Sequence, residues 1–317
     1  MFNKLSTKNL FALFVVLLLV VIYLLFFNSG EERTFRRELV SLDTAKVNKI
    51  VIYPKDKKNK TIYLSKDSNK WKVKIADNKY AAVPKEKVVN LLNELSKIKP
   101  VSLSARDKSK WHDYQVDSTG IRVQAYENDK PALDIVIGRF SYQQPNSIFT
   151  YVRLFNDADV YQTEGFLSIS FNKSVNDFRN SNIIESNKTK WVKLTYQYPA
   201  DSSFVLVRSG SRWKIGSQLT DSATTEQLLN NLERITSTDF NDNFMPQKSQ
   251  APVYKLIINM SDTSKITVDA YKTSPEDNSQ IIIHSSQNPD SFFTLNKELH
   301  SRIFLSPKKF MVKSKTK

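Results

Sequence analysis

The sequence contains no cysteine among its 317 residues. A chain without thiols forms no disulfide, no thiolate metal site and no cysteine nucleophile. Exported bacterial domains often fold without disulfides, so this absence is compatible with a location outside the cytoplasm. It does not establish such a location.

Glycine and histidine are also scarce. The six glycines never cluster, so no glycine-rich loop can surround a phosphate group with backbone amides. His112, His284 and His300 are far apart and form no His-Glu-x-x-His pair, which leaves a zinc site without support. The sequence also lacks the Gly-x-Ser-x-Gly elbow of many hydrolases. We therefore expect no metal, no cofactor and no enzymatic activity.

Acidic residues leave one question open. Asp239 to Asn243 resembles the start of a calcium loop, because oxygen-bearing side chains alternate along it. However, Phe244 stands where the loop needs glycine, and Gln250 stands where it needs a bidentate acid. Sequence spacing cannot exclude two carboxylates that meet across the fold, so acid–base catalysis is unsupported but still open.

The most informative stretch is the apolar run at residues 10–27, which has no charge, glycine or proline. With a helical rise of about 1.5 Å per residue, the run covers roughly the hydrocarbon thickness of a bilayer. It is longer than the apolar core of a cleaved signal peptide, and no small-residue cleavage site follows it. The run therefore predicts an uncleaved transmembrane helix over residues 10–27.

The charges around this run do not fix its orientation. Lys4 and Lys8 in the leading segment, residues 1–9, favour a cytoplasmic N-terminus. Three arginines that follow the run oppose this bias, at Arg33, Arg36 and Arg37. A short tail before a signal-like run normally leaves the large C-terminal part to be exported. We therefore expect a cytoplasmic tail at 1–9, a stalk at 28–41 and an extracytoplasmic body on a bacterial inner membrane.

The chain is strongly basic, with a net charge of +15 and a pI near 9.6. This charge suits nucleic acid, anionic lipid head groups or an acidic envelope polymer. The expected extracytoplasmic location argues against nucleic acid. The basic residues are spread along the chain, apart from a cluster between Lys55 and Lys60 and the basic tail at 311–317. A solvated lysine-rich surface explains these runs equally well.

Beyond the stalk, the alternation of apolar and polar residues predicts strands. A meander of three is expected at 46–53, at 61–66 and around Trp71 to Ile75. A helix is expected from Pro84 to Ile98, because prolines at both ends frame an apolar helical face. After a polar loop at 104–118, further strands and one short helix are expected at 121–126, 133–137, 149–154, 160–162 and 164–171.

The same order of segments then recurs. Trp71-Lys72-Val73 returns as Trp213-Lys214-Ile215, and the helix residues Leu91-Leu92 return as Leu228-Leu229. Further matches link Lys49-Ile50 with Lys193-Leu194, Tyr53-Pro54 with Tyr198-Pro199, Ser174 with Ser306, and Phe178 with Phe310. The sequence therefore predicts an α+β fold with two homologous repeats, at 42–180 and 184–310. Each is expected to be a twisted antiparallel sheet with one main covering helix.

Tryptophans are the candidate contact residues. Trp71 and Trp213 occupy the same strand of the two repeats. This position favours packing of both side chains in the core between sheet and helix over stacking on a sugar or peptide. Trp111 lies in the polar loop among basic and aromatic residues, so we interpret this loop as a candidate contact surface. An ordinary loop anchor explains Trp111 equally well. The predicted surface consists of Arg106, Lys108, Lys110, Trp111 and Tyr114.

Several short segments resemble a family of bacterial envelope proteins, the domain of unknown function numbered 4340. The segments are Trp71-Lys72-Val73, Val83-Pro84, Leu91-Leu92, Leu95, Ile137-Gly138, Tyr151-Val152-Arg153, Val160-Tyr161 and Phe178-Arg179. None of them is a catalytic signature. The resemblance implies an N-terminal membrane anchor and an association with gliding-motility-type ABC transporter permeases, beside which such proteins are often encoded.

These observations favour a non-enzymatic, single-pass membrane protein with a periplasmic binding or scaffolding body. It would be an accessory of an ABC-type export or gliding-motility apparatus, with the membrane, a permease or other envelope proteins as partners. One alternative is an envelope hydrolase with a carboxylate site between the repeats. Another is a binder of anionic envelope polymer or lipid. A deep cleft with convergent acids would favour the hydrolase, whereas a shallow face rich in Trp and Lys would favour binding.

Overall fold

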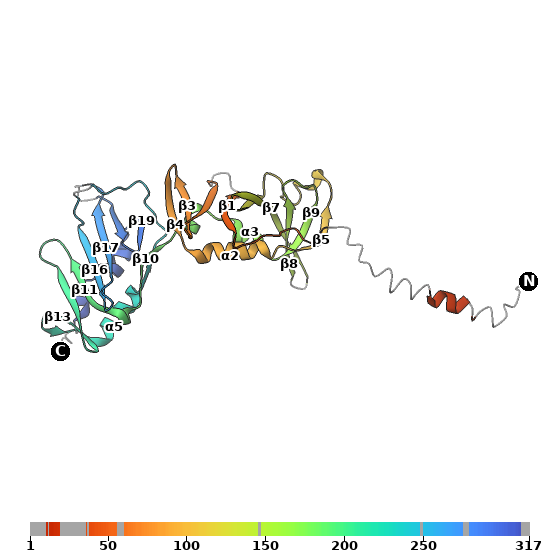
Figure 1. Ribbon diagram of the computed structural model, residues 1–317. Helices are drawn as coiled ribbons and strands as arrows, with labels where there is room; N and C mark the ends of the chain where they lie inside the picture. Colours follow the sequence, from red (N-terminus) through yellow and green to blue (C-terminus); the bar gives the residue numbers. More distant parts are fainter. Residues whose placement is uncertain are drawn as a thin grey trace, which may run out of the picture.

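The computed structural model describes residues 11, 13–19, 36, 38–55, 60–144, 147–247, 250–274 and 279–311. Within these ranges the chain forms two lobes, each built on one large antiparallel sheet (Figure 1). A few helices accompany the sheets, so the predicted α+β class is confirmed. The first lobe holds β1 to β9, and the second holds β11 to β19.

The first sheet contains nine described strands in the order β4-β3-β2-β1-β6-β7-β8-β9-β5. Every neighbouring pair is antiparallel. The strands are β1 (Val47–Tyr53), β2 (Ile62–Asp67), β3 (Lys70–Ala76), β4 (Lys79–Val83), β5 (Pro100–Ala105), β6 (Ile121–Glu127), β7 (Lys130–Gln143), β8 (Ser147–Leu154) and β9 (Val160–Glu164). Alternation places Ile121, Val123 and Ala125 in the core, whereas Arg122 and Gln124 belong to the opposite face.

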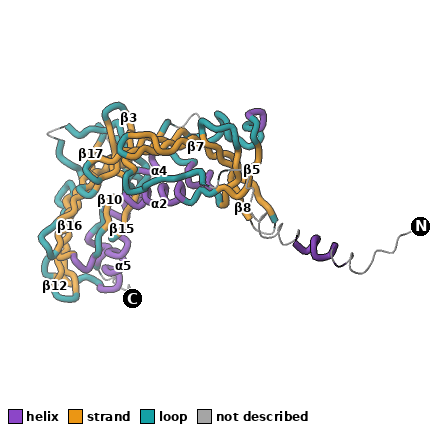
Figure 2. Tube along the Cα trace, turned by 45° about the vertical axis from the view of Figure 1, so that its right-hand side comes forward, coloured by secondary structure: helices purple, strands orange, loops and turns teal. Residues whose placement is uncertain are grey.

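Helix α2 (Lys85–Ser96) follows Pro84 and covers one face of this sheet (Figure 2). It buries Val88, Leu91, Leu92 and Leu95, which are spaced along one helical face. The position of this helix agrees with the sequence prediction. The remaining helical segments of the lobe are η1 (Lys108–Lys110), α3 (Leu167–Phe171) and α4 (Val175–Phe178).

The second sheet contains eight described strands in the order β14-β13-β12-β11-β16-β17-β18-β19. They are β11 (Trp191–Gln197), β12 (Phe204–Ser209), β13 (Arg212–Ile215), β14 (Gln218–Leu219), β16 (Tyr254–Met260), β17 (Lys265–Lys272), β18 (Ile281–Ser285) and β19 (Asn288–Thr294). A separate ladder pairs β10 (Asn182–Glu185) with β15 (Arg234–Thr236). The helical segments are η2 (Lys188–Lys190), α5 (Ser222–Leu232), α6 (Lys297–Ile303) and η3 (Pro307–Phe310).

The strand order of the second sheet repeats that of β4 to β9 in the first, without a counterpart of the edge strand β5, and the two sheets also share residue register. Ile50 pairs with Leu64 on one side and Ala125 on the other, and Leu194 pairs in the same way with Leu206 and Ile258. A register shift early in β1 recurs early in β11, next to Lys49 and Lys193 respectively. These pairings match the sequence repeat residue by residue. Common descent of the repeats, and their limits at 42–180 and 184–310, remain predictions.

Each lobe has its own hydrophobic core. Trp71 and Trp213 are 6% and 5% exposed and belong to separate clusters of buried residues. Their burial agrees with the interpretation of the two tryptophans as core plugs. The prediction missed several strands, notably β4, where alanines weaken the apolar pattern, and β5, which was placed partly in a loop.

Much of the N-terminal region lies outside the described residues. Of the predicted transmembrane helix at 10–27, the structure describes Phe11 and residues 13–19, all in helical conformation. In the described part of the chain, no helix is both long and apolar enough to cross a membrane. The predicted tail at 1–9, most of the stalk at 28–41 and most of the basic tail at 311–317 also lie outside it. Leu39 and Val40, placed in the stalk by the sequence, pack into the first core.

Candidate binding surface

The polar loop at 106–120 lies against the first sheet, on the face opposite α2. Arg106, Lys108 and Lys110 are exposed, whereas Trp111 and Tyr114 are half-buried. The Trp111 indole N–H donates to the Ala158 carbonyl at 3.0 Å. Its ring also stacks on a guanidinium 3.6 Å from the ring centroid. Trp111 therefore anchors the loop, and a contact role for the five predicted residues stays a prediction.

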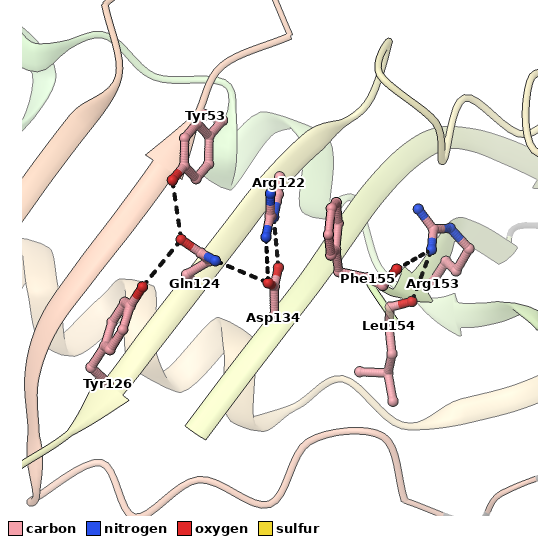
Figure 3. A network of polar contacts seen from close by, with 8 residues as sticks. All are labelled: Tyr53, Arg122, Gln124, Tyr126, Asp134, Arg153, Leu154 and Phe155. Carbon is pink, nitrogen blue, oxygen red and sulfur yellow. Dashed lines mark hydrogen bonds and ion pairs between the residues drawn. The ribbon is translucent and has the colours of Figure 1, made fainter. Parts of the chain in front are cut away.

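Arg153 supplies that guanidinium and is itself 3% exposed. It donates to the carbonyl oxygens of Val116, Leu154, Phe155 and Asp157 at 2.7 to 3.0 Å. Figure 3 shows the bonds to Leu154 and Phe155. Burial lowers the pKa of Arg153. Four carbonyl oxygens accept hydrogen bonds from this guanidinium, and one indole stacks on it. Arg153 therefore fixes the loop to β8 and is not a free binding group.

The loop approaches β7 so closely that a glycine is required. A Cβ atom at Gly138 would lie 2.2 Å from the Tyr114 carbonyl oxygen and 2.8 Å from a methyl group of Val116. The next residue, Arg139, donates its backbone N–H to the same Tyr114 oxygen at 3.0 Å. Gly138 therefore allows the loop to pack directly against β7.

The end of this loop is ordered around Asp117. Thr119 donates to one carboxylate oxygen of Asp117 through its hydroxyl at 2.6 Å and its amide at 2.9 Å. His112 Nδ1 lies 3.0 Å from the other oxygen. Burial by itself would raise the pKa of Asp117, but hydrogen bonds from Thr119 and His112 outweigh burial and lower it to about 2. The carboxylate therefore stays charged and holds the turn that leads into β6.

A pocket of about 410 Å³ opens where this turn meets β7 and α3. Its polar lining comes from Lys55, Gln115, Thr119, Arg139, Ser168, Asn172 and Lys173. Three of these residues are cationic, and no acidic side chain is among the lining residues that the structure describes. We call the three, Lys55, Arg139 and Lys173, the cationic triad.

The cationic triad has no carboxylate partner within the described ranges. Lys55 Nζ donates to the Gln115 side-chain oxygen at 2.7 Å, and Arg139 Nε donates to the Asp113 carbonyl at 2.7 Å. Both acceptors are neutral, and Lys173 also lines a second pocket that contains the acids Glu94 and Asp177. Phe140 and Ile169 also line the pocket and are 48% and 58% exposed. The pocket therefore combines cations that form no ion pair with a described carboxylate and exposed apolar side chains, which suits an acidic group attached to an apolar one.

A second polar cluster crosses the open face of the first sheet (Figure 3). Arg122 forms two hydrogen bonds with Asp134, at 2.8 and 2.6 Å, and Gln124 donates to the same carboxylate at 2.9 Å. The hydroxyl groups of Tyr53 and Tyr126 donate to the Gln124 oxygen at 3.1 and 3.3 Å. The hydrogen bonds with Asp134 raise the pKa of Arg122. These partners satisfy one another, which indicates a structural network.

The lobes meet at an ion pair between a buried arginine and a partly exposed aspartate. Arg179 is fully buried, and its two terminal nitrogens bond the two oxygens of Asp242 at 2.9 and 2.8 Å. Its guanidinium also stacks 3.6 Å from the centroid of the Phe240 ring. Lys79 of β4 donates to the Asp242 carbonyl, which adds a direct link from the first sheet. We call the Arg179–Asp242 pair the interlobe latch.

A pocket of about 310 Å³ beside the interlobe latch contains both Asp242 and Asp290. Both carboxylate oxygens of Asp242 accept from Arg179, so this acid is not a free partner for Asp290. In the described part of the chain, no group of acids and histidines has a metal-binding arrangement. The calcium-like stretch that begins at Asp239 instead supplies the latch.

The cationic triad and the latch could not be read from sequence spacing, because their members lie far apart along the chain. Two segments of the family resemblance, Tyr151-Val152-Arg153 and Phe178-Arg179, do contain the buried arginines. Nothing in the sequence assigned a role to either arginine.

Comparisons with known proteins identify a family. The sequence model of a family described as Domain of unknown function (DUF4340) matches residues 74–256, from β3 into β16. The matched region is more than half of the chain and includes parts of both lobes. A search of curated proteins and a search of solved structures found no match.

Proposed function

Because the chain belongs to the DUF4340 family, whose description assigns no activity, we propose its function from its own geometry. The protein is a non-enzymatic, single-pass membrane protein with an extracytoplasmic body that binds or scaffolds envelope components. The observation that carries this proposal is the pocket of the cationic triad. Three cations that form no ion pair with the described carboxylates attract an acidic ligand, and no acid is among the described residues that line this pocket.

Rigidity supports the scaffolding part of this proposal. The interlobe latch joins the two sheets through a bidentate pair that water reaches only on the aspartate side, where the side chain is 40% exposed. A body held in this way can present surfaces from both lobes in a fixed relation. The predicted anchor at 10–27 would keep these surfaces near membrane partners and raise the effective concentration for each contact.

The proposed partner class is an ABC-type export or gliding-motility apparatus, as the family resemblance implies. Chemical cross-linking in intact membranes, followed by mass spectrometry, tests this partner. We expect a permease or another envelope protein to be recovered with the wild-type chain. Recovery should fall when Lys55, Arg139 and Lys173 are changed to Glu. Recovery of no envelope component would contradict the proposal.

A matched control separates local charge from net charge. Lys193, Lys265 and Lys297 of the second lobe are exposed, and their replacement by Glu changes the net charge by the same amount. We expect this control variant to retain its cross-links. Equal loss of cross-links in both variants would indicate a general electrostatic effect. It would contradict the proposal that the pocket of the cationic triad binds the partner.

Orientation is tested separately with a reporter enzyme that is active only outside the cytoplasm. Fused after residue 317, it should be active if the large body is exported. Activity of a cytosolic reporter at the same position would reverse the proposed topology.

The hydrolase alternative requires two free carboxylates in the interlobe pocket. Asp242 is bound to Arg179 through both oxygens, so the geometry favours binding over hydrolysis. The alternative of an anionic polymer or lipid ligand agrees with the cationic triad. Such binding should weaken in moderate salt, because exposed charges are screened.

A further inference from the structure

We propose that the cationic triad and an adjoining apolar strip dock the first lobe onto the anionic lipid surface of the membrane that holds the anchor. This inference rests on the proposed function, because it requires the predicted helix at 10–27 to insert. It adds a partner of defined chemistry and an orientation of the body relative to the bilayer.

The apolar strip belongs to the β7–β8 hairpin. Tyr142 and Ile148 are directly opposite each other in the strand pairing, and Phe140 lies two residues before Tyr142. Side chains two residues apart share one face of a strand, so the three form a continuous strip. They are 48%, 57% and 40% exposed in the order Phe140, Tyr142, Ile148. Ile169 of α3, which is 58% exposed, extends this apolar surface.

The strip and the triad adjoin each other. Arg139 immediately precedes Phe140, at a register shift between Ile137 and Phe140. Phe140 and Ile169 line the same pocket as Lys55, Arg139 and Lys173. An edge-to-face contact with Phe166, with centroids 4.3 Å apart, supports the Phe140 ring. Apolar side chains flanked by cations are the pattern that favours the boundary between acyl chains and anionic head groups.

The course of the chain leaves this patch within reach of the bilayer. Arg36 pairs with Asp157, in the turn between β8 and β9, at 3.4 Å. An extended chain from residue 27 to residue 36 spans at most about 30 Å, so this turn stays near the end of the predicted anchor. Strand β8 covers roughly 25 Å between the turn and the strip.

The second lobe lies at the other end of the first. Strands β5, β8 and β9 lie at the end where the chain enters, whereas β4 faces the second lobe (Figure 1). Membrane lipid is therefore the partner that the anchor brings to the strip and the triad. A soluble ligand would gain nothing from this placement.

The absence of cysteine makes a direct test practicable. Single cysteines introduced by Gln143→Cys, Leu18→Cys and Leu219→Cys can each carry one fluorophore in the full chain. Residue 143 follows the strip without removing any part of it, residue 18 reports on the anchor, and residue 219 is an exposed control in the second lobe. Each labelled protein is placed in lipid nanodiscs that contain phosphatidylglycerol and a nitroxide-labelled quencher lipid.

We expect strong quenching at residues 18 and 143, and at least severalfold weaker quenching at residue 219. Lys55→Glu, Arg139→Glu and Lys173→Glu together should reduce quenching at 143 to the level at 219. Discs of phosphatidylcholine alone, or about 500 mM salt, should have a similar effect. The matched variant with Glu at 193, 265 and 297 should retain quenching at 143.

The possible failures can be distinguished. Quenching at 18 without quenching at 143 overturns lipid docking and leaves the anchor intact. Quenching at 143 without quenching at 18 shows lipid contact without an inserted anchor, which overturns docking beside the anchor. Quenching at neither position overturns both the inserted anchor and lipid docking. Equal quenching at 143 in phosphatidylcholine discs overturns the role of the cations. A photo-crosslinker at 143 that captures a permease in native membranes, without lipid contact, would assign the strip to a protein partner and overturn the proposal.

Discussion

At the scale of single residues, the arginines of this protein differ in how their charge is compensated. Arg153 is enclosed by carbonyl oxygens and an indole, and Arg179 is enclosed by a carboxylate and a phenyl ring. A planar guanidinium with several donors suits such buried positions better than an ammonium group does. Among the described residues, the Arg139 side chain donates only to a neutral carbonyl, and its guanidinium lies over the rings of Tyr114 and Tyr151. This contrast is what separates structural cations from the candidate binding cations.

Asp117 carries the residue-scale prediction. Its pKa in the folded protein, about 2, lies below the ordinary value of 3.8, so its ionised form stabilises the fold above about pH 4. That contribution is lost as the pH falls from about 4 to about 2. Asp117→Asn should therefore lower the free energy of unfolding by about 1 to 2 kcal/mol at pH 7. The difference from wild type should shrink through the same pH window, measured by urea unfolding at each pH.

Asp113→Asn is the control for this prediction. Asp113 pairs with Lys110 at 3.3 Å, and both side chains are more than half exposed. Surface pairs of this kind contribute little, so the control should unfold like wild type at every pH. A constant difference between Asp117→Asn and wild type from pH 7 to pH 2 would mean that carboxylate ionisation is not the cause.

At the scale of elements, the two covering helices perform the same task in separate cores. Leu95 of α2 and Leu232 of α5 are each fully buried, and their hydrophobic clusters share no residue. The short β14, of two residues, and the pairing of β15 with β10 distinguish the second lobe from the first. Each helix therefore stabilises its own sheet by burying apolar surface.

Leu95→Ala and Leu232→Ala should each cost about 2 to 5 kcal/mol, because each leaves a cavity in a packed core. Hydrogen exchange should then lose protection mainly in β1–β9 for Leu95→Ala and mainly in β11–β19 for Leu232→Ala. Val89→Ala is a control, since Val89 lies on α2 but is 40% exposed. Equal loss of protection in both lobes from either core variant would mean that the lobes unfold as one unit.

At the scale of the whole molecule, the interlobe latch sets the relation between the sheets. Asp242→Ala would leave the fully buried Arg179 without its anionic partner, a loss that costs about 3 to 5 kcal/mol where both partners are buried and less here, because Asp242 is 40% exposed. We expect the latch to loosen rather than the lobes to unfold, because neither core contains these two side chains. Spin labels at Val89→Cys and Val205→Cys should give a broader distance distribution in this variant.

Asp269→Ala is the matched control for the latch. Asp269 pairs with Lys255 at 3.1 Å between neighbouring strands of the second sheet. Its loss should leave the distance distribution between the lobes unchanged. An unchanged distribution in Asp242→Ala as well would mean that other contacts, such as Asn288 with the backbone of residues 180 and 182, fix the lobes.

The sequence by itself determined the features that depend on local pattern. The apolar positions of α2, the alternation in the strands and the repeat of Trp71 at Trp213 predicted a duplicated α+β arrangement, because periodicity is written along the chain. The strand register was not predicted, although a slip of one residue would turn Ile50 or Leu194 out of its core. Strand β4, whose alternation is weak, and the β10–β15 ladder were not predicted from this pattern.

Only the tertiary structure decided which of the described charges form ion pairs. Lys55, Arg139 and Lys173 come from three distant segments and meet because a bulge, a close-packed loop and α3 converge. Arg179 and Asp242 likewise become partners only when both lobes are folded. A lysine or arginine looks the same in sequence whether a carboxylate faces it or not. Burial and distance separate the two cases, and both are properties of the folded chain.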